Sequence, residues 1–172
     1  MKIVGFVVLL ALALAAILVV VGQLGFLRGQ PPAGLGVQQG RLKPPSLTPN
    51  SVSSQAGLYA DHPQRSYAEV APFRYAGDGK AAMRRLAVLL EASERTVLVT
   101  REPGYLYAQA TTALLKFTDD MEFYLDEAAS VIHVRSASRI GRGDLGANRA
   151  RVEALRARFE QSGGKAGVLL NK

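Results

Sequence analysis

Carboxylate, imidazole and guanidinium groups gather in two short segments that have the pattern of neighbouring strands. In residues 121–125 and 132–135 apolar side chains alternate with polar ones, which is typical of strands with one buried face. When the apolar faces of such strands pair, the opposite face is shared by Asp120, Glu122, His133 and Arg135. A carboxylate beside a histidine can support acid and base catalysis. A solvated sheet face has the same composition, so we favour a structural interpretation, expect no catalytic residue and treat these four as candidate binding residues.

The turn that follows, residues 135–146, carries arginines and glycines next to the start of an expected helix. Backbone N–H groups at a helix start, with arginines beside them, can bind an anion. Asp144 at the expected N-cap would satisfy those groups internally and repel an anion. Asn148 falls on the apolar side of the helix and must find hydrogen-bond partners nearby. We therefore predict one polar cluster, which either pins the turn to the sheet or binds a ligand, made of Arg135, Ser138, Arg139, Asp144, Asn148 and Arg149.

Other kinds of chemical site have little support in the sequence. The chain has no cysteine, which excludes disulfides, thiolate metal sites and a cysteine nucleophile. The two histidines, His62 and His133, lack the spacing of a helical zinc motif, and the serines of residues 50–54 lack a nucleophile motif. The glycines of residues 141–146 are not followed by the lysine of a phosphate-binding loop. We expect neither a metal ion nor a cofactor.

The chain is basic, with a formal net charge of +7, but its charges are separated along the sequence. Residues 119–127 hold five acidic side chains and no basic one, whereas residues 135–158 hold seven arginines and two acids. Because the two blocks can neutralise each other in the folded chain, we expect no nucleic-acid partner.

The amino-terminal segment is long and apolar enough to cross a membrane. No charged residue lies between Lys2 and Arg28, and Ile3 to Val21 would form a helix of the length that spans a ~30 Å hydrocarbon core. We predict an uncleaved signal anchor over residues 1–28 rather than a removed signal peptide, because the apolar run continues without a small-residue cleavage site. Basic residues at both ends leave the orientation ambiguous. We expect a single-pass protein of the inner (cytoplasmic) membrane with its domain in the periplasm.

The remaining residues predict a linker, one domain and a tail. Residues 29–55 are rich in Pro and Gly and predict a linker that becomes ordered towards its end, and residues 163–172 predict a flexible tail. Between them, residues 56–162 predict a single small α+β domain with an antiparallel sheet of about four strands and two helices packed on one face.

Periodicity places the elements of this domain. Residues 80–92 predict an amphipathic helix with Asp78 as N-cap, and residues 96–112 predict a β-hairpin that turns at 102–105. A last helix is expected from a stripe at helical spacing, which consists of Leu145, Asn148, Val152, Leu155 and Phe159.

Three stretches carry a likeness to a known family. They are Pro49 to Gln55 (PNSVSSQ), Phe117 to Phe123 (FTDDMEF) and Val131 to Arg151, which includes the run RSASRIGRGDLGANRAR. Together they resemble domain of unknown function 1499, over about residues 42–160. The resemblance implies one domain in a bacterial or plastid membrane or an exported compartment, and it implies no reaction. Pro45 and Ser51 stand where many members look to have cysteines, so any thiol role in the family is absent here.

These observations support three classes of function. The leading hypothesis is a non-enzymatic binding or assembly module of the cell envelope, which engages an envelope protein through the polar sheet face and the RSASR turn. The second is a small hydrolase or anion-binding enzyme that uses His133, Glu122 and Arg135. The third is a sensor of anionic membrane surfaces through the basic carboxyl-terminal helix. The oligomeric state stays open.

Overall fold

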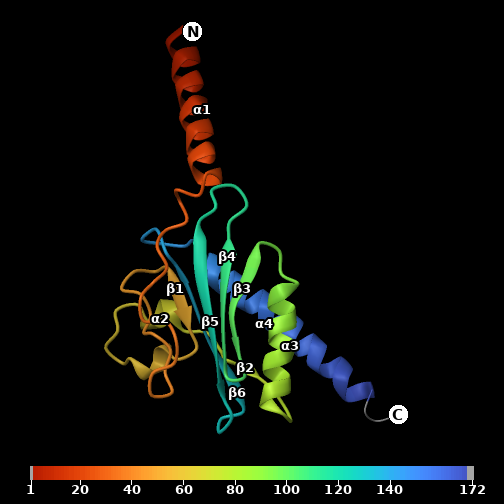
Figure 1. The fold of residues 1–172 in the computed structure, drawn as a ribbon. Coiled ribbons are helices and arrows are strands. Elements are labelled where there is room, and N and C mark those ends of the chain that lie inside the picture. Colours follow the sequence, from red (N-terminus) through yellow and green to blue (C-terminus); the bar gives the residue numbers. More distant parts are fainter. Residues whose placement is uncertain (1, 170–172) are drawn as a thin grey trace.

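A computed structural model describes residues 2–169, with side chains through residue 163. The chain begins with α1 (Lys2–Gln23), a 22-residue apolar helix that projects away from the rest of the molecule (Figure 1). Its mean hydropathy is 3.3 and its apolar window is unburied, so its length and composition suit a membrane span or a signal sequence. Within residues 2–169 it is the one helix with this property.

An antiparallel sheet forms the centre of the domain, in the order β1-β6-β5-β4-β3, with β2 pairing a different part of β6. The strands are β1 (Ser51–Ser53), β2 (Phe73–Arg74), β3 (Thr96–Glu102), β4 (Tyr105–Thr111), β5 (Thr118–Asp126) and β6 (Val131–Ser138). The predicted α+β class is confirmed, but the sheet has six strands instead of about four. The two additional strands, β1 and β2, are three and two residues long, too short for an alternating pattern to reveal.

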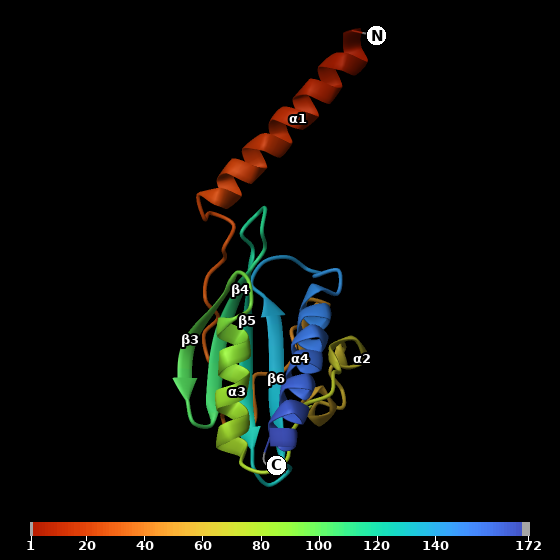
Figure 2. The ribbon, with the colours of Figure 1, turned by 90° about the vertical axis from the view of Figure 1, so that its right-hand side faces the viewer.

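Two helices, α3 (Gly79–Glu91) and α4 (Ala147–Leu169), lie side by side on one face of the sheet (Figure 2). Asp78 caps α3 as predicted, because its side chain accepts a hydrogen bond from Lys80 N–H. Between helices and sheet lies an apolar core in which Phe73 packs edge to face on Phe123 and Phe159, with ring centroids 5.8 and 5.6 Å apart. Two short helices, η1 (Ala56–Leu58) and α2 (Arg65–Ala68), lie beside β1.

The last helix differs from its prediction at both ends. Leu145 is fully exposed and has a positive φ of 51°, so it lies before the helix, and the buried stripe begins at Asn148. At the other end, α4 continues to Leu169, through most of the segment predicted as a flexible tail. The rest of that tail, residues 170–172, lies outside the described residues.

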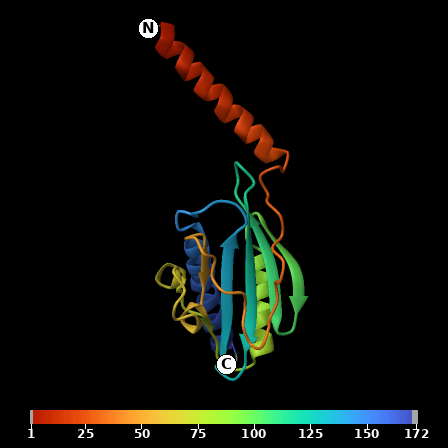
Figure 3. The same cartoon turned by 90° about the vertical axis from the view of Figure 1, so that its left-hand side faces the viewer.

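Much of the predicted linker, residues 29–55, is held against the sheet. We call residues 33–46 the strap; in Figure 3 this chain crosses the sheet face that α3 and α4 leave free. Leu42 is buried, its N–H donates to Gln55 Oε1 (2.8 Å), and Ser46 N–H donates to Ser51 Oγ (2.7 Å). The packed part of the chain therefore extends well before residue 56, the predicted start of the domain. Hydrogen bonds from distant residues order a segment whose composition alone predicts disorder.

Strand β3 is the last strand in the order of the sheet and pairs with β4 alone, so its other edge is free. Its pairing with β4 shifts between Leu98 and Thr100, which leaves Val99 outside the ladder as a bulge. Val97 and Val99 are both exposed.

Candidate functional site

The pairing of β5 with β6 brings the predicted acidic and basic side chains to one face. Glu122 lies opposite Arg135, and Tyr124 lies opposite His133. The sequence suggested a solvated face, but the structure shows a buried one: Glu122 is 0% exposed, Asp120 1% and Arg135 5%. The strap covers Glu122 and Arg135, because Gly36 N–H donates to Glu122 Oε1 (2.8 Å) and Arg135 Nε–H donates to the carbonyl of Pro44 (3.2 Å).

Asp120 and Arg139 form a buried, two-pronged ion pair. Arg139 donates from Nε to Oδ2 (2.8 Å) and from Nη2 to Oδ1 (2.7 Å). The hydroxyl of Tyr107 also donates to Asp120 Oδ1 (2.6 Å), and Gln109 Nε2 donates to that hydroxyl (2.8 Å). The hydrogen bonds to Asp120 raise the pKa of the Arg139 guanidinium. Every polar atom of Asp120 is therefore engaged inside the domain, and this pair is well matched in charge and geometry.

Glu122 and Arg135 form a second buried pair that is less complete. Tyr105 donates its hydroxyl to Glu122 Oε1 (2.9 Å), but Glu122 Oε2 and Arg135 Nη1 are 3.8 Å apart and neither has a hydrogen-bond partner. Burial lowers the pKa of Arg135, and burial next to Glu122 raises the pKa of Tyr105. Two buried polar atoms without hydrogen-bond partners are costly, so this pair is less well matched than the pair of Asp120 and Arg139.

His133 belongs to a separate group of residues. Its Nδ1 lies 3.1 Å from Ser54 Oγ, its Nε2 lies 3.6 Å from Asp126 Oδ2, and its ring stacks on Tyr124. Burial lowers the pKa of the imidazole below 6.5, although Asp126 opposes the shift. Within residues 2–163 no hydrogen bond or ion pair joins His133 to Glu122 or Arg135. The predicted combination of His133, Glu122 and Arg135 is thus not assembled. The polar neighbours of His133 are instead Ser54 and Asp126, which were not predicted as its partners.

The serine and the acid beside His133 had detectable signals. Ser54 ends the serine cluster of residues 50–54, and Asp126 continues the alternation of the acidic strand onto the face of His133. The Oγ of Ser54 also accepts a hydrogen bond from Val134 N–H (2.9 Å), which fastens the chain after β1 to β6. This contact gives the serine a structural role of its own.

The other predicted site residues lie on the helix-covered face. Asn148 is completely buried and donates to Asn50 O (3.2 Å), Ser138 Oγ (2.9 Å) and Asp144 Oδ2 (2.8 Å). Ser138 therefore belongs with Asn148, whereas Arg135 and Arg139 point to the strap side. The expected single cluster is two clusters separated by the sheet, because successive strand residues alternate between faces.

Asp144 caps α4 from outside the helix. Its carboxylate accepts from Gly146 N–H (3.0 Å), from Asn148 N–H (3.0 Å) and from the Tyr67 hydroxyl. Burial alone would raise the pKa of Asp144, but these hydrogen bonds outweigh it and hold that pKa below its ordinary value. The helix start is filled by the protein's own carboxylate, which disfavours the anion site considered for the RSASR turn.

The arginines of α4 turn towards the domain. Arg149 donates to the carbonyls of Tyr67 and Glu69, Arg151 pairs with Asp119 (2.6 Å), and Arg158 donates to Ser93 Oγ (2.9 Å). Arg156 contacts Glu153 and the carbonyl of Ala71. These contacts leave the helix poorly suited to the predicted role of a basic surface that faces lipid.

A cavity of about 620 Å³ lies along the strap. Polar and apolar residues both line it, and the charged side chains in the lining are Arg41 and Lys43. Lys43 Nζ also donates to the carbonyl of Ala33 (2.7 Å), which bridges the strap. The strap hydrogen-bonds to Glu122 and Arg135 through Gly36 and Pro44, two residues that line the cavity. Sequence reasoning missed Arg41 and Lys43, because basic residues in a Pro/Gly segment look like solvated linker residues.

The described residues contain no group of three His, Asp or Glu side chains arranged to hold a metal ion. Residues 41–159 match the family model described as "Protein of unknown function (DUF1499)". The chain belongs to the DUF1499 family. No curated protein and no solved structure matches it. The DUF1499 region contains the complete sheet, both polar clusters and α4 as far as Phe159, and it leaves α1 outside.

Proposed function

We propose that this chain is a single-pass membrane protein of the cell envelope whose DUF1499 domain is a non-enzymatic binding module. Support for the anchor comes from α1, whose 22 residues extend for about 33 Å, enough for a ~30 Å hydrocarbon core. The side of the membrane that we propose for the domain is the periplasmic side of the inner membrane.

We propose that the binding site is the strap cavity, and that its ligand is an acidic segment of an envelope protein. One observation carries this proposal: the sheet face below the strap pairs its own charges internally, whereas the cavity above presents Arg41 and Lys43. A cavity with cationic lining and no acidic one favours a negatively charged ligand. The proposed site thus lies over the polar sheet face that the sequence favoured as the binding surface. Its lining, however, comes mainly from the strap.

Peptide binding tests this proposal. The full chain in detergent micelles is titrated against a fluorescein-labelled oligoglutamate peptide, and anisotropy is measured at rising salt. Binding is expected to weaken with salt and to be lost in Arg41→Glu, while Arg84→Glu, a change on the exposed side of α3, should leave it intact. Equal affinity of both variants would remove the cavity as the binding site.

The proposed side of the membrane is tested separately. Alkaline phosphatase fused after Lys172 is active only outside the cytoplasm, whereas green fluorescent protein fused there fluoresces inside it. Phosphatase activity without fluorescence is expected. The reverse pattern would place the domain in the cytoplasm and leave the cavity proposal untouched.

One observation favours a second candidate, a serine hydrolase that uses Ser54, His133 and Asp126. The three side chains are joined at 3.1 and 3.6 Å, and lowering of the histidine pKa favours the neutral form that a general base needs. The hydrogen bond from Val134 to Ser54 argues against it. A fluorophosphonate probe that labels the full chain, but not Ser54→Ala, would support the enzyme; absence of labelling in both would favour the binding module.

A further inference from the structure

The loop between β4 and β5 carries exposed apolar residues at the end of the domain nearest α1. Two hydrogen bonds close the loop at its base, from Thr112 N–H to Phe117 O (2.9 Å) and from Phe117 N–H to Thr112 Oγ1 (3.0 Å). At its tip Leu114 is 59% exposed. A single exposed leucine is ordinary on a protein surface, so the apolar side chains around this loop decide whether Leu114 belongs to a larger apolar patch.

This loop is fastened to the last turn of α1. Gln23 Nε2 donates to the carbonyl of Leu114 (2.8 Å). Gly22 packs so closely on Leu115 that a Cβ at position 22 would lie 2.6 Å from its carbonyl oxygen, so a larger residue would push the two apart. The tip of the loop is therefore held at the level where α1 ends.

Further exposed apolar side chains surround the same place. Leu24 and Phe26 directly follow α1, and Phe26 is 75% exposed. Ile140, in the loop that follows β6, is also exposed and lies against Gly29, where the chain descends from α1. Residues from three separate parts of the sequence thus present apolar side chains around the foot of one helix.

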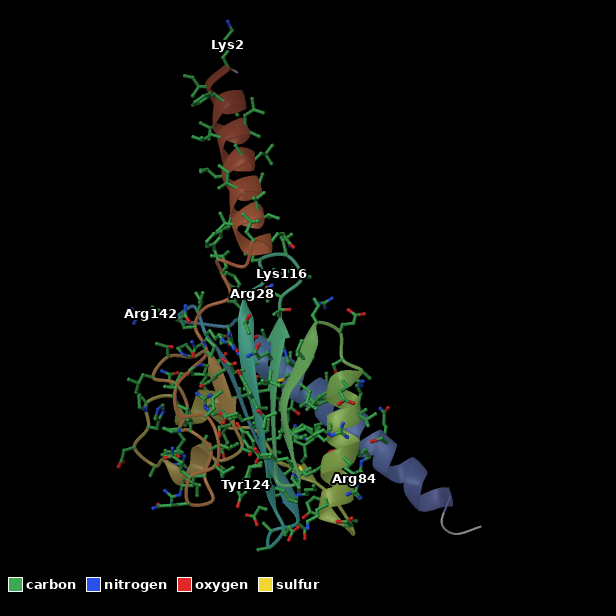
Figure 4. The ribbon with its side chains drawn as sticks, in the orientation of Figure 1. Lys2, Arg28, Arg84, Lys116, Tyr124 and Arg142 are labelled. Carbon is green, nitrogen blue, oxygen red and sulfur yellow. The ribbon has the colours of Figure 1, made fainter. Side chains whose placement is uncertain are left out.

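Basic residues accompany these apolar side chains. Figure 4 shows Arg28 and Lys116 just below α1, and Arg142 at the same end of the domain. Acidic groups nearby are neutralised: Asp119 and Asp120 pair with Arg151 and Arg139, and Asp144 is held by Tyr67 and Asn148. Glu94, in the neighbouring α3–β3 loop, pairs with Arg95 (2.9 Å). The end that faces α1 therefore has an excess of positive charge.

We propose that this end of the domain docks onto the bilayer that α1 spans, and that it binds anionic phospholipid. We call the contact residues the membrane collar; they are Leu24, Phe26, Arg28, Leu114, Lys116, Ile140 and Arg142. Its apolar members enter the boundary between headgroups and acyl chains, and its cations contact lipid phosphates. The inference rests on the proposed membrane anchor, because only a membrane-spanning α1 brings the collar to the interface.

The length of α1 supports the position of the membrane collar at the boundary between headgroups and acyl chains. The helix is long enough to cross the hydrocarbon core, so the residues immediately after Gln23 lie at the headgroup level. Long basic side chains near the ends of membrane-spanning helices extend their charged groups to that level. Since the β4–β5 loop is bonded to Gln23, Leu114 reaches the same depth without any further movement of the domain.

Site-specific fluorescence tests the docking, and the absence of cysteine makes single labelling simple. Leu114→Cys is labelled with the environment-sensitive dye NBD in the full chain and reconstituted into vesicles of phosphatidylcholine with or without phosphatidylglycerol. The matched control is Ala128→Cys in the exposed β5–β6 turn, at the other end of β5 and about 30 Å away along a nine-residue strand. Near-ultraviolet circular dichroism checks that both labelled chains are folded.

We expect doxyl-labelled lipid to quench the dye at position 114 and aqueous iodide to quench it at position 128. Quenching at 114 should be stronger with phosphatidylglycerol, and Lys116→Glu should lower the ratio of docked to undocked protein about fivefold, as should Arg142→Glu. Iodide quenching at 114 equal to that at 128 would overturn the inference. If the full chain fails to float with vesicles after carbonate washing, the membrane anchor itself is wrong, which is a distinguishable result.

Discussion

Asp120 and Arg139 show how much one buried residue contributes when its geometry is complete. Both charges are removed from water, which is unfavourable, and two parallel hydrogen bonds offset that cost. The neighbouring pair of Glu122 and Arg135 lacks such bonds between its members. The two pairs lie on the same face, but the members of the first pair are joined by hydrogen bonds and those of the second are not.

Arg139→Ala is therefore expected to lower the free energy of unfolding by about 3–5 kcal/mol, because it leaves the Asp120 carboxylate buried without its partner. Arg139→Lys should recover only part of the loss, since an ammonium group cannot form both hydrogen bonds. Urea unfolding of the full chain in detergent measures both changes. The control is Arg84→Ala, whose exposed pair with Asp78 should contribute about 0–1 kcal/mol. Similar losses at 84 and 139 would contradict this account.

His133 predicts a dependence of stability on pH. Its pKa is lowered by burial in the folded chain, with Asp126 opposing, so near pH 6.5 the unfolded chain binds more protons than the folded chain. The contribution of His133 to the free energy of unfolding should therefore be constant above about pH 6.5 and decrease as the pH falls below it, towards the lowered pKa of the folded chain. In His133→Gln the slope in this window should become smaller. A slope that is unchanged, or steeper, would show that the imidazole is not the group responsible.

At this scale the sequence predicted which side chains share a face, but not their surroundings. Alternation in residues 121–125 placed Glu122 correctly relative to Arg135, because a strand has a fixed period of two. Burial of Glu122 depends on Gly36, 86 residues away, and no local pattern reports such a contact. Leu145 was misplaced for a related reason: its spacing fits the helical stripe, but a positive φ takes the backbone out of the helix there.

Among the elements, α4 is attached to the rest of the domain by side chains in its first turn and just before it. The Asp144 carboxylate accepts hydrogen bonds from Gly146 N–H, just before the helix, and from Asn148 N–H in its first turn. The Asn148 side chain links the helix to β6 and to the chain before β1. A buried amide whose two N–H groups are shared among three acceptors is a specific link between elements, and its loss leaves several acceptors without a partner.

Asn148→Ala is expected to lower the free energy of unfolding by about 1–3 kcal/mol through these unpaired groups. Asp144→Ala should cost about 0.5–2 kcal/mol through loss of the cap. Because Asp144 and Asn148 contact each other, the double variant should cost less than the sum of the single changes. Chemical unfolding of the three variants in parallel measures this coupling, and strict additivity would argue against one connected network.

Long, periodic elements were predictable and short ones were not. The amphipathic pattern of residues 80–92, the hairpin of residues 96–112 and both central strands appear in the structure near the expected positions. Strands β1 and β2 exist because β6 has an unpaired edge for them to join, which is a property of the assembled sheet. The same holds for the strap, whose order comes from hydrogen bonds to side chains of other elements.

In the whole molecule, the two faces of the sheet have different tasks. One face is closed by α3 and α4 over an apolar core, and the other by the strap over paired charges. Because only residues 24–32 separate α1 from the strap, the chain that follows α1 is part of the domain's own packing. A domain expressed from residue 56 would lack β1 and the strap, and we expect it to be less stable than the full chain by circular dichroism melting.

The bulge at Val99 has a consequence for solubility. A regular outermost strand with exposed valines is a template on which further copies can polymerise by backbone pairing, and an irregularity interrupts that template. Deletion of Val99 should restore an uninterrupted ladder and increase the tendency of the protein to form fibrils. Thioflavin fluorescence and light scattering would detect them, and Val97→Lys in the same deletion should suppress them. One surplus residue thus acts as a safeguard against amyloid-like growth.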